Sequence, residues 1–212
     1  MNSQVFDNYP LTIREYSMGT EITLAELHRV ILDFLRGRKD VALFGAQAVN
    51  AYVDAPRMTV DVDVMSVSAE QFASEVCQHL HDRLQITARI RTVASGKGFR
   101  VYQMQTPDNR HLVDVRQVIE LPPCRLISGI LVIQPPDLIA QKLIAMVARK
   151  NTPKSLTDQV DIMRLLLAFP VLKAIEGEIV GALLRNNAAA SVYRSWQELV
   201  ESKFTADSDE DY

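Results

Sequence analysis

Alternating valine and aspartate residues between Val60 and Val64 constrain the fold more than any other feature of this sequence. Successive side chains of a β-strand point to opposite faces, so Asp61 and Asp63 would share one face, about 7 Å apart. Aspartate disfavours strands, and two like charges on one face repel each other. A solvated strand face tolerates such a pair, whereas a divalent cation between the carboxylates would turn repulsion into attraction. The pattern predicts a strand over Arg57–Val67 with two candidate metal ligands.

A third carboxylate lies on another predicted strand. Within His111–Val118, Asp114 occupies one face of an alternating pattern, and Val113 and Val115 occupy the other. If this strand lies beside the acidic one, three carboxylates converge, and such a set can hold two Mg²⁺ ions for phosphoryl transfer. Taken alone, an aspartate at this position is more often a charge on an edge strand.

The first 120 residues mix strand and helix patterns. Thr23 and Glu26 have the spacing of a capping box before an amphipathic helix. Gly45 stands between an apolar strand and a short helix, where a glycine lets the backbone approach a phosphate. Besides the two strands above, we predict helices at Thr23–Arg36, Ala46–Tyr52 and Ala69–Leu84, and strands at Val41–Phe44, Gln85–Val93 and Phe99–Gln105.

The second half of the sequence is helical. After a short apolar strand at Ile130–Ile133, helical spacing continues from Asp137 to about Phe204, and Pro153 and Pro170 divide it into about four helices. We therefore predict an α+β fold, with a mixed sheet flanked by helices in residues 1–120 and a helical region in residues 121–204.

Charge is unevenly distributed along the 212 residues, whose formal net charge is -3. Residues 205–212 carry four acidic and no basic side chains, which predicts a disordered acidic tail. The composition as a whole shows no strong nucleic-acid footprint. The best candidate for a polyanion-binding surface is a basic cluster around one predicted hairpin, although a solvated hairpin is the alternative: Arg89, Arg91, Lys97, Arg100 and Arg110.

No apolar run approaches the roughly 18–20 residues that a membrane-spanning helix needs. The first ten residues lack both the basic and the apolar part of a secretory signal. The two cysteines, Cys77 and Cys124, are too far apart in the sequence to suggest a metal pair or a disulfide framework. We therefore expect a cytoplasmic protein that does not associate with membranes.

Taken together, the Gly45-Ala46 turn, the Asp61-Val62-Asp63 strand and Asp114 resemble the nucleotidyltransferase superfold of the polymerase β type. More narrowly, Ala42–Tyr52 followed by Arg57-x-Thr59-x-Asp61-x-Asp63 is similar to AbiEii-type nucleotidyltransferases and their minimal relatives, many of which are toxins of type IV toxin–antitoxin systems. Pro135–Leu143 resembles the segment leading into that family's lysine helix, and Lys154–Ile162 resembles its following Asp-containing stretch. The resemblance covers about residues 40–167.

This resemblance implies Mg²⁺-dependent transfer of a nucleoside monophosphate from an NTP to a hydroxyl acceptor, which would be an RNA end, a protein or a small molecule. Two Mg²⁺ ions and an antitoxin partner are also implied. Asp61 and Asp63 would bind Mg²⁺, and Asp114 would bind the second ion or act as a base. The residues implied to act on the substrate are Gly45, Ala46, Arg57, Thr59, Lys142, Arg149 and Asp158.

Two alternatives stay open. Ala46 replaces the serine or glycine usual in the family and removes a hydroxyl, which favours a catalytically inactive protein that binds a nucleotide or a partner on the same fold. The complete set of three acids disfavours it, because an inactive site has no need of repelling carboxylates. Lys142 also suits a solvated helix position, and Asp158 with Asp161 suits surface ion pairing with Arg149.

Overall fold

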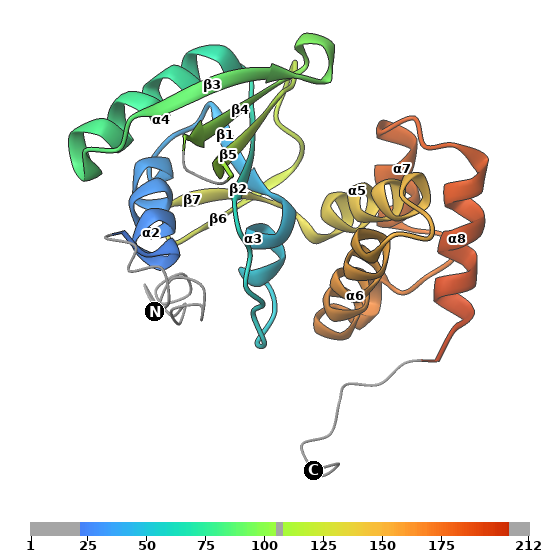
Figure 1. Cartoon of the computed structure of the whole chain (residues 1–212). Coiled ribbons are helices and arrows are strands. Elements are labelled where there is room, and N and C mark those ends of the chain that lie inside the picture. The colour runs from blue at the N-terminus through green and yellow to red at the C-terminus, as the bar shows by residue number, and fades with distance from the viewer. Residues whose placement is uncertain (1–21, 105–107, 204–212) are drawn as a thin grey trace. The chain divides into compact units, whose positions relative to one another are not determined.

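The computed structural model describes residues 22–104 and 108–203. The chain divides into two compact units, shown together in Figure 1. The sheet unit comprises Met1–Ala51 and Ala55–Ile133, and the helical unit comprises Tyr52–Asp54 and Gln134–Tyr212. The division falls after Ile133 and not at residue 120, because residues 124–133 form a strand pair that joins the sheet. The predicted acidic tail, 205–212, lies outside the described residues.

The sheet unit contains a mixed seven-stranded sheet in the order β3-β4-β5-β2-β1-β7-β6. The pairs β2–β5 and β1–β7 are parallel, and the other neighbours are antiparallel. With its flanking helices this sheet makes the α+β fold that the sequence predicts. The strands are β1 (Val41–Phe44), β2 (Val62–Ser66), β3 (Ala88–Val93), β4 (Gly98–Gln103), β5 (Arg110–Gln117), β6 (Cys124–Ile127) and β7 (Ile130–Ile133).

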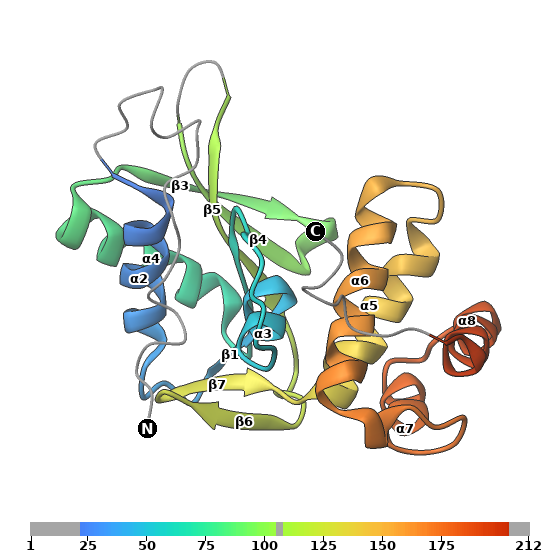
Figure 2. The same cartoon turned by 90° about the horizontal axis from the view of Figure 1, so that it is seen from below.

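Within its described residues, this unit has three α-helices: α2 (Leu24–Leu35), α3 (Gly45–Asn50) and α4 (Ala69–Leu84). Helix α2 begins as the capping pattern predicts, because the Glu26 backbone N–H donates to Thr23 Oγ1 at 3.1 Å. Helix α4 packs against β3, β4 and β5, and it also contacts α2, so the two helices lie side by side in Figure 2. Helix α3 contacts β1 and β2.

Alternation along β4 and β5 gives this part of the sheet one apolar and one polar face. Val101, Val113 and Val115 are buried against the layer that contains α4. Their neighbours Arg100 and Asp114 point to the opposite face and are partly exposed. The polar face is therefore the one available for chemistry.

Strand β2 is shorter than predicted, because only Val62–Ser66 of the expected Arg57–Val67 is a strand. Before it, Val60 is 66% exposed and Thr59 is buried, so the valine alternation does not follow the sheet there. Asn50 holds this irregular segment with two bonds: its Nδ2 donates to the Arg57 carbonyl at 2.8 Å, and the Arg57 N–H donates to its Oδ1 at 3.0 Å. Side-chain bonds to the backbone thus replace the ladder that the pattern suggested.

Strand β6 was not predicted from the sequence. It has only four residues and lies at the edge of the sheet, where Arg125 and Leu126 are exposed. Such a strand has no buried face to impose a clear apolar alternation.

The helical unit contains four α-helices in its described part: α5 (Pro135–Ala148), α6 (Pro153–Ala168), α7 (Glu178–Arg185) and α8 (Ala190–Glu201). Helix α6 begins at the proline that marks a break in the sequence, where the Ser155 N–H donates to Thr152 Oγ1. Helix α5 contacts the other three. Buried Leu143, Ile162 and Trp196 contribute to the core. Across the residues that the structure describes, none of the helices combines the length and the apolar character required to cross a bilayer.

Candidate metal centre

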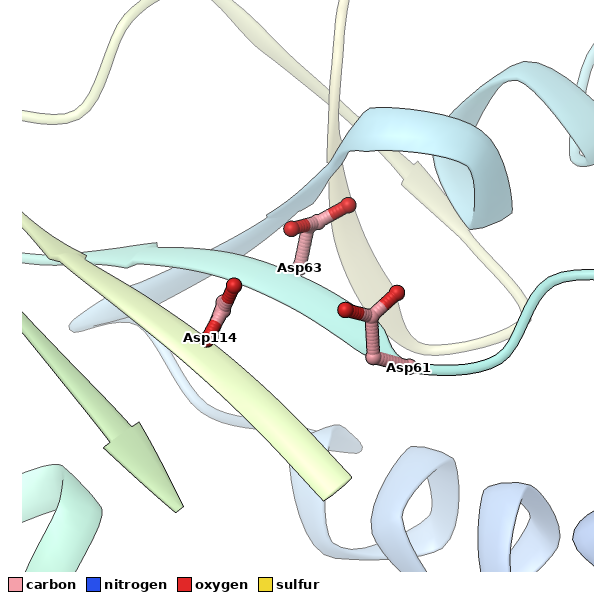
Figure 3. Close-up of side chains that lie close together, drawn as sticks. All are labelled: Asp61, Asp63 and Asp114. Carbon is pink, nitrogen blue, oxygen red and sulfur yellow. The ribbon is translucent and has the colours of Figure 1, made fainter. Parts of the chain in front are cut away.

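Three aspartates converge on the polar face of the sheet. One carboxylate oxygen from each of Asp61, Asp63 and Asp114 lies within 4.8 Å of those of the other two, and all three residues are half-buried. Asp63 and Asp114 stand directly opposite each other on the parallel strands β2 and β5. Figure 3 shows the three side chains on the same side of these two strands. The structure therefore brings together the three acids that the sequence singled out.

Asp61 lies just before β2, not within it. Thr59 fixes this bend, since its Oγ1 donates to the Asp61 carbonyl at 3.0 Å. Burial, and next the negative charge of Asp114, raise the pKa of the Asp61 carboxyl above its ordinary value. The half-buried position therefore resists ionisation of Asp61, and a bound cation would relieve that resistance.

Position 45, at the junction of β1 and α3, requires a glycine for two reasons. Its φ of 68° lies in the left-handed region that glycine adopts without steric cost. A Cβ at this position would lie 2.7 Å from the Cβ and the Cγ of Asp63, closer than real contacts allow. The hydrogen side chain of Gly45 thus makes the space that the Asp63 carboxylate occupies.

Two arginines flank the triad. Arg100 on β4 binds Asp114 with both ends of its guanidinium: Nε donates to Oδ1 and Nη2 donates to Oδ2, each at 2.6 Å. This bond raises the pKa of Arg100. The Arg116 guanidinium lies over the Phe44 ring, 4.7 Å from its centroid, where Asp63 and Asp114 act on it electrostatically.

The sequence analysis did not single out Arg116, although its position could have done so. Arg116 follows Asp114 by two residues on the same strand and therefore shares its face. From the sequence, Arg100 was assigned only to the basic hairpin cluster, because the tertiary structure decides that β4 pairs with β5. Within that cluster, Arg91 stands opposite Arg100, and Arg89 lies two residues further along the same face. Arg110 donates to the Ile22 carbonyl.

The donor set fits a hard divalent cation. Carboxylate oxygens are the ligands that Mg²⁺ prefers, and Mg²⁺ sites in phosphoryl-transfer enzymes commonly use one or two carboxylates together with substrate phosphates. Asp61, Asp63 and Asp114 offer three carboxylates within reach of one another, and Gly45 clears the space beside one of them. Two ions at such a site would align an attacking and a leaving oxygen.

The remaining predicted site residues fall in two places. Ala46 is buried next to Gly45, and Arg57 is half-buried, with its Nη1 donating to the Met58 carbonyl. Lys142, Arg149 and Asp158 belong to the helical unit.

In the helical unit, basic and acidic side chains form one ion-pair cluster between α5 and α6. Lys142 Nζ donates to Asp158 Oδ1 at 3.2 Å and to Asp161 Oδ2 at 2.8 Å, and Arg149 also binds Asp158. Asp158 and Asp161 are buried, whereas Arg149 is exposed. Two buried carboxylates thus hold the lysine and the arginine in fixed positions, which is more than a surface ion pair does.

Comparison with known proteins identifies the family to which this arrangement corresponds. The family model described as "Nucleotidyl transferase AbiEii toxin, Type IV TA system" matches residues 32–211. No curated protein matches the sequence.

Among solved structures, the Megavirus polyadenylate synthase is similar, with 18% identity, a TM-score of 0.55 and coverage of 74% of this chain. The match covers 34% of the synthase, so this chain spans about a third of that protein. JHP933 from Helicobacter pylori is similar over 90% of both chains, with 13% identity and a TM-score of 0.51. At these identities, the two structures show a common fold.

Replacing Gly45 by alanine tests the close packing against Asp63. We expect Gly45→Ala to lower the free energy of unfolding by about 1–3 kcal/mol, because it strains the backbone and displaces a carboxylate. Gly37→Ala is the matched control, since Gly37 also has positive φ (74°) but open space around its Cβ position. Urea unfolding should show the larger loss for Gly45→Ala; equal losses would contradict the packing role.

The raised pKa of Asp61 predicts a pH-dependent effect of Asp61→Asn in metal-free buffer. The folded protein retains the Asp61 proton to higher pH than the unfolded chain, so ionisation opposes folding as the pH rises through the raised pKa. Urea unfolding with EDTA between about pH 4 and about pH 8 should show Asp61→Asn gaining stability relative to wild type toward higher pH. A constant difference would contradict the raised pKa.

Proposed function

The chain belongs to the AbiEii family of nucleotidyltransferases, and we propose that it transfers a nucleoside monophosphate from an NTP to an acceptor hydroxyl at its three aspartates. The convergence of Asp61, Asp63 and Asp114 is the observation that carries this proposal. Nucleotidyl transfer needs closely spaced hard ligands on a rigid support, because catalysis rests on positioning and on neutralising phosphate charge.

Asp61 and Asp63 would hold Mg²⁺, and Asp114 completes the donor set. The bound metal supplies charge neutralisation at the phosphate oxygens and alignment of the reacting oxygens. The acceptor oxygen forms a bond to the α-phosphorus while the bond to the β-phosphate oxygen breaks, so that pyrophosphate leaves. A carboxylate of the triad takes the hydroxyl proton. Thr59 and Asn50 act indirectly, because their bonds fix the segment that carries Asp61.

The family's motif positions assign further contacts with the triphosphate within each unit. Gly45 and Ala46 offer backbone at the β1–α3 junction, and Arg57, whose backbone Asn50 holds, offers a cation. Lys142 and Arg149 would meet phosphate charge as cations that Asp158 and Asp161 orient. These assignments follow the motif positions of the family.

Among the acceptor classes, RNA has the best support. Arg89, Arg91 and Arg100 form a basic strip on the triad's face, running outward across β4 to the edge strand β3. Like charges opposite each other on neighbouring strands, as in Arg91 and Arg100, oppose folding. Within residues 22–104 and 108–203, Arg89 and Arg91 have no ion-pair partner, and both are exposed. A phosphodiester backbone would neutralise this strip, whereas a small acceptor would not need it.

The family description is that of a type IV toxin, and this supports a toxin role for the chain with an antitoxin partner. The competing function is nucleotide or partner binding without transfer, and the alanine at position 46 favours it. A thermal shift with NTP and Mg²⁺ but no product would identify that alternative.

The Asp63→Asn variant tests the reaction. With α-³²P-labelled NTPs, Mg²⁺, total RNA and cell lysate, we expect the wild type to label an acceptor and Asp63→Asn to lose about a thousandfold in rate, because the metal contributes several kcal/mol to the transition state. Asp82→Asn, on the exposed surface of α4, is the control and should keep full activity. Unchanged transfer by a folded Asp63→Asn protein would refute the proposed site.

Neutralising the basic strip tests the acceptor. Arg89→Gln/Arg91→Gln should raise KM for RNA while leaving KM for NTP unchanged, since neither side chain touches the triad. If each arginine contacts one phosphate of a single strand, the log–log salt slope of RNA binding falls by about 1.4. Arg83→Gln, on α4, is the matched control. An equal effect of the control, or no effect of the double variant, would favour a protein or small-molecule acceptor.

A further inference from the structure

Arg100 and the two strand-borne aspartates lie in one row across the sheet. Arg100 on β4 is paired in register with Asp114 on β5, and Asp114 is paired with Asp63 on β2. Side chains of directly paired residues point to the same face. The row therefore places a guanidinium, a carboxylate and a second carboxylate side by side in that order.

The bond between Arg100 and Asp114 engages both carboxylate oxygens. Its two 2.6 Å contacts have the forked geometry that makes arginine–carboxylate pairs strong and directional. Both side chains are only partly exposed, at 35% and 26%, so the pair is incompletely screened by solvent. A cation that approaches Asp114 must share these oxygens with Arg100 or displace it.

The charges around the triad set how many divalent ions it retains. Three carboxylates face two guanidinium groups, those of Arg100 and Arg116. These five groups leave a formal charge of about −1, so one divalent ion brings the site to about +1 and a second ion to about +3. A triphosphate would supply the negative charge that a second ion needs.

On this basis we propose that Arg100 is a positioning residue that serves as the fixed counter-cation of Asp114 and limits the nucleotide-free protein to one divalent ion. Asp61 and Asp63 hold that ion, while Arg100 supplies at Asp114 the positive charge that a second ion would bring. This inference rests on the proposed function for the identity of the metal site. It adds that, before nucleotide binds, Asp114 faces an arginine and not a metal.

Counting bound Mn²⁺ by the loss of its free EPR signal tests this role without any measure of catalysis. The nucleotide-free wild type should bind one Mn²⁺ per chain, and Arg100→Gln should bind two. Arg100→Lys keeps the charge and should return the count to one. Arg91→Gln is the matched control, because Arg91 lies opposite Arg100 on the same face but donates to none of the three carboxylates. It should bind one ion.

A second variant keeps the inference testable if Arg100→Gln does not fold. Asp114→Asn should retain one Mn²⁺ with an affinity within about threefold of the wild type, whereas Asp63→Asn should lose at least about tenfold. Two ions on the wild type, one ion on folded Arg100→Gln, or a second ion on Arg91→Gln would overturn the proposal. An equal loss in Asp114→Asn and Asp63→Asn would overturn it as well.

The Mn²⁺ count is separable from the test of transfer. One ion on the wild type and two on Arg100→Gln, together with no labelled product from any NTP, would leave the role of Arg100 intact and refute the proposed transfer. Labelled product together with two ions on the nucleotide-free wild type would refute the role of Arg100 and leave the proposed transfer intact.

Discussion

The repulsion among three carboxylates is the constraint on which the rest of the sheet unit depends. Asp63 and Asp114 stand directly opposite each other on parallel strands, and Asp61 joins them from the bend before β2. Such a cluster opposes folding unless positive charge is near it. The protein places Arg100 on one side and Arg116 on another, and it leaves space at Gly45. These features bring positive charge and space to the acids.

The helical unit also contains neighbouring acidic side chains, and there ion pairs compensate their charge. Asp158 and Asp161 are buried, and each binds Lys142, so an ion-pair network replaces the water they lost. Burial of such a network does not in itself add stability, because desolvation offsets the attraction between the charges. Its benefit is geometric, since fixed carboxylates hold the cations in one position. In both units, ion pairs therefore hold acidic and basic side chains in fixed positions relative to each other.

Local signals predicted most elements well, and they were wrong where side chains replaced the regular ladder. The capping pair Thr23 and Glu26 set the start of α2, and proline set the start of α6. The acidic strand was predicted too long, because valine alternation continues through an irregular segment that Asn50 and Thr59 hold. Strand β6 escaped detection because an exposed edge strand of four residues carries little periodicity.

The sequence by itself determined the acids, their spacing and the family motif, because strand periodicity and residue chemistry are local properties. It also marked Gly45, although for an approach to phosphate and not for its contact with Asp63. Only the tertiary structure decided that β5 lies parallel to β2 and that β4 brings Arg100 onto Asp114. Those pairings join residues far apart in the chain, and their register depends on which faces the whole sheet buries.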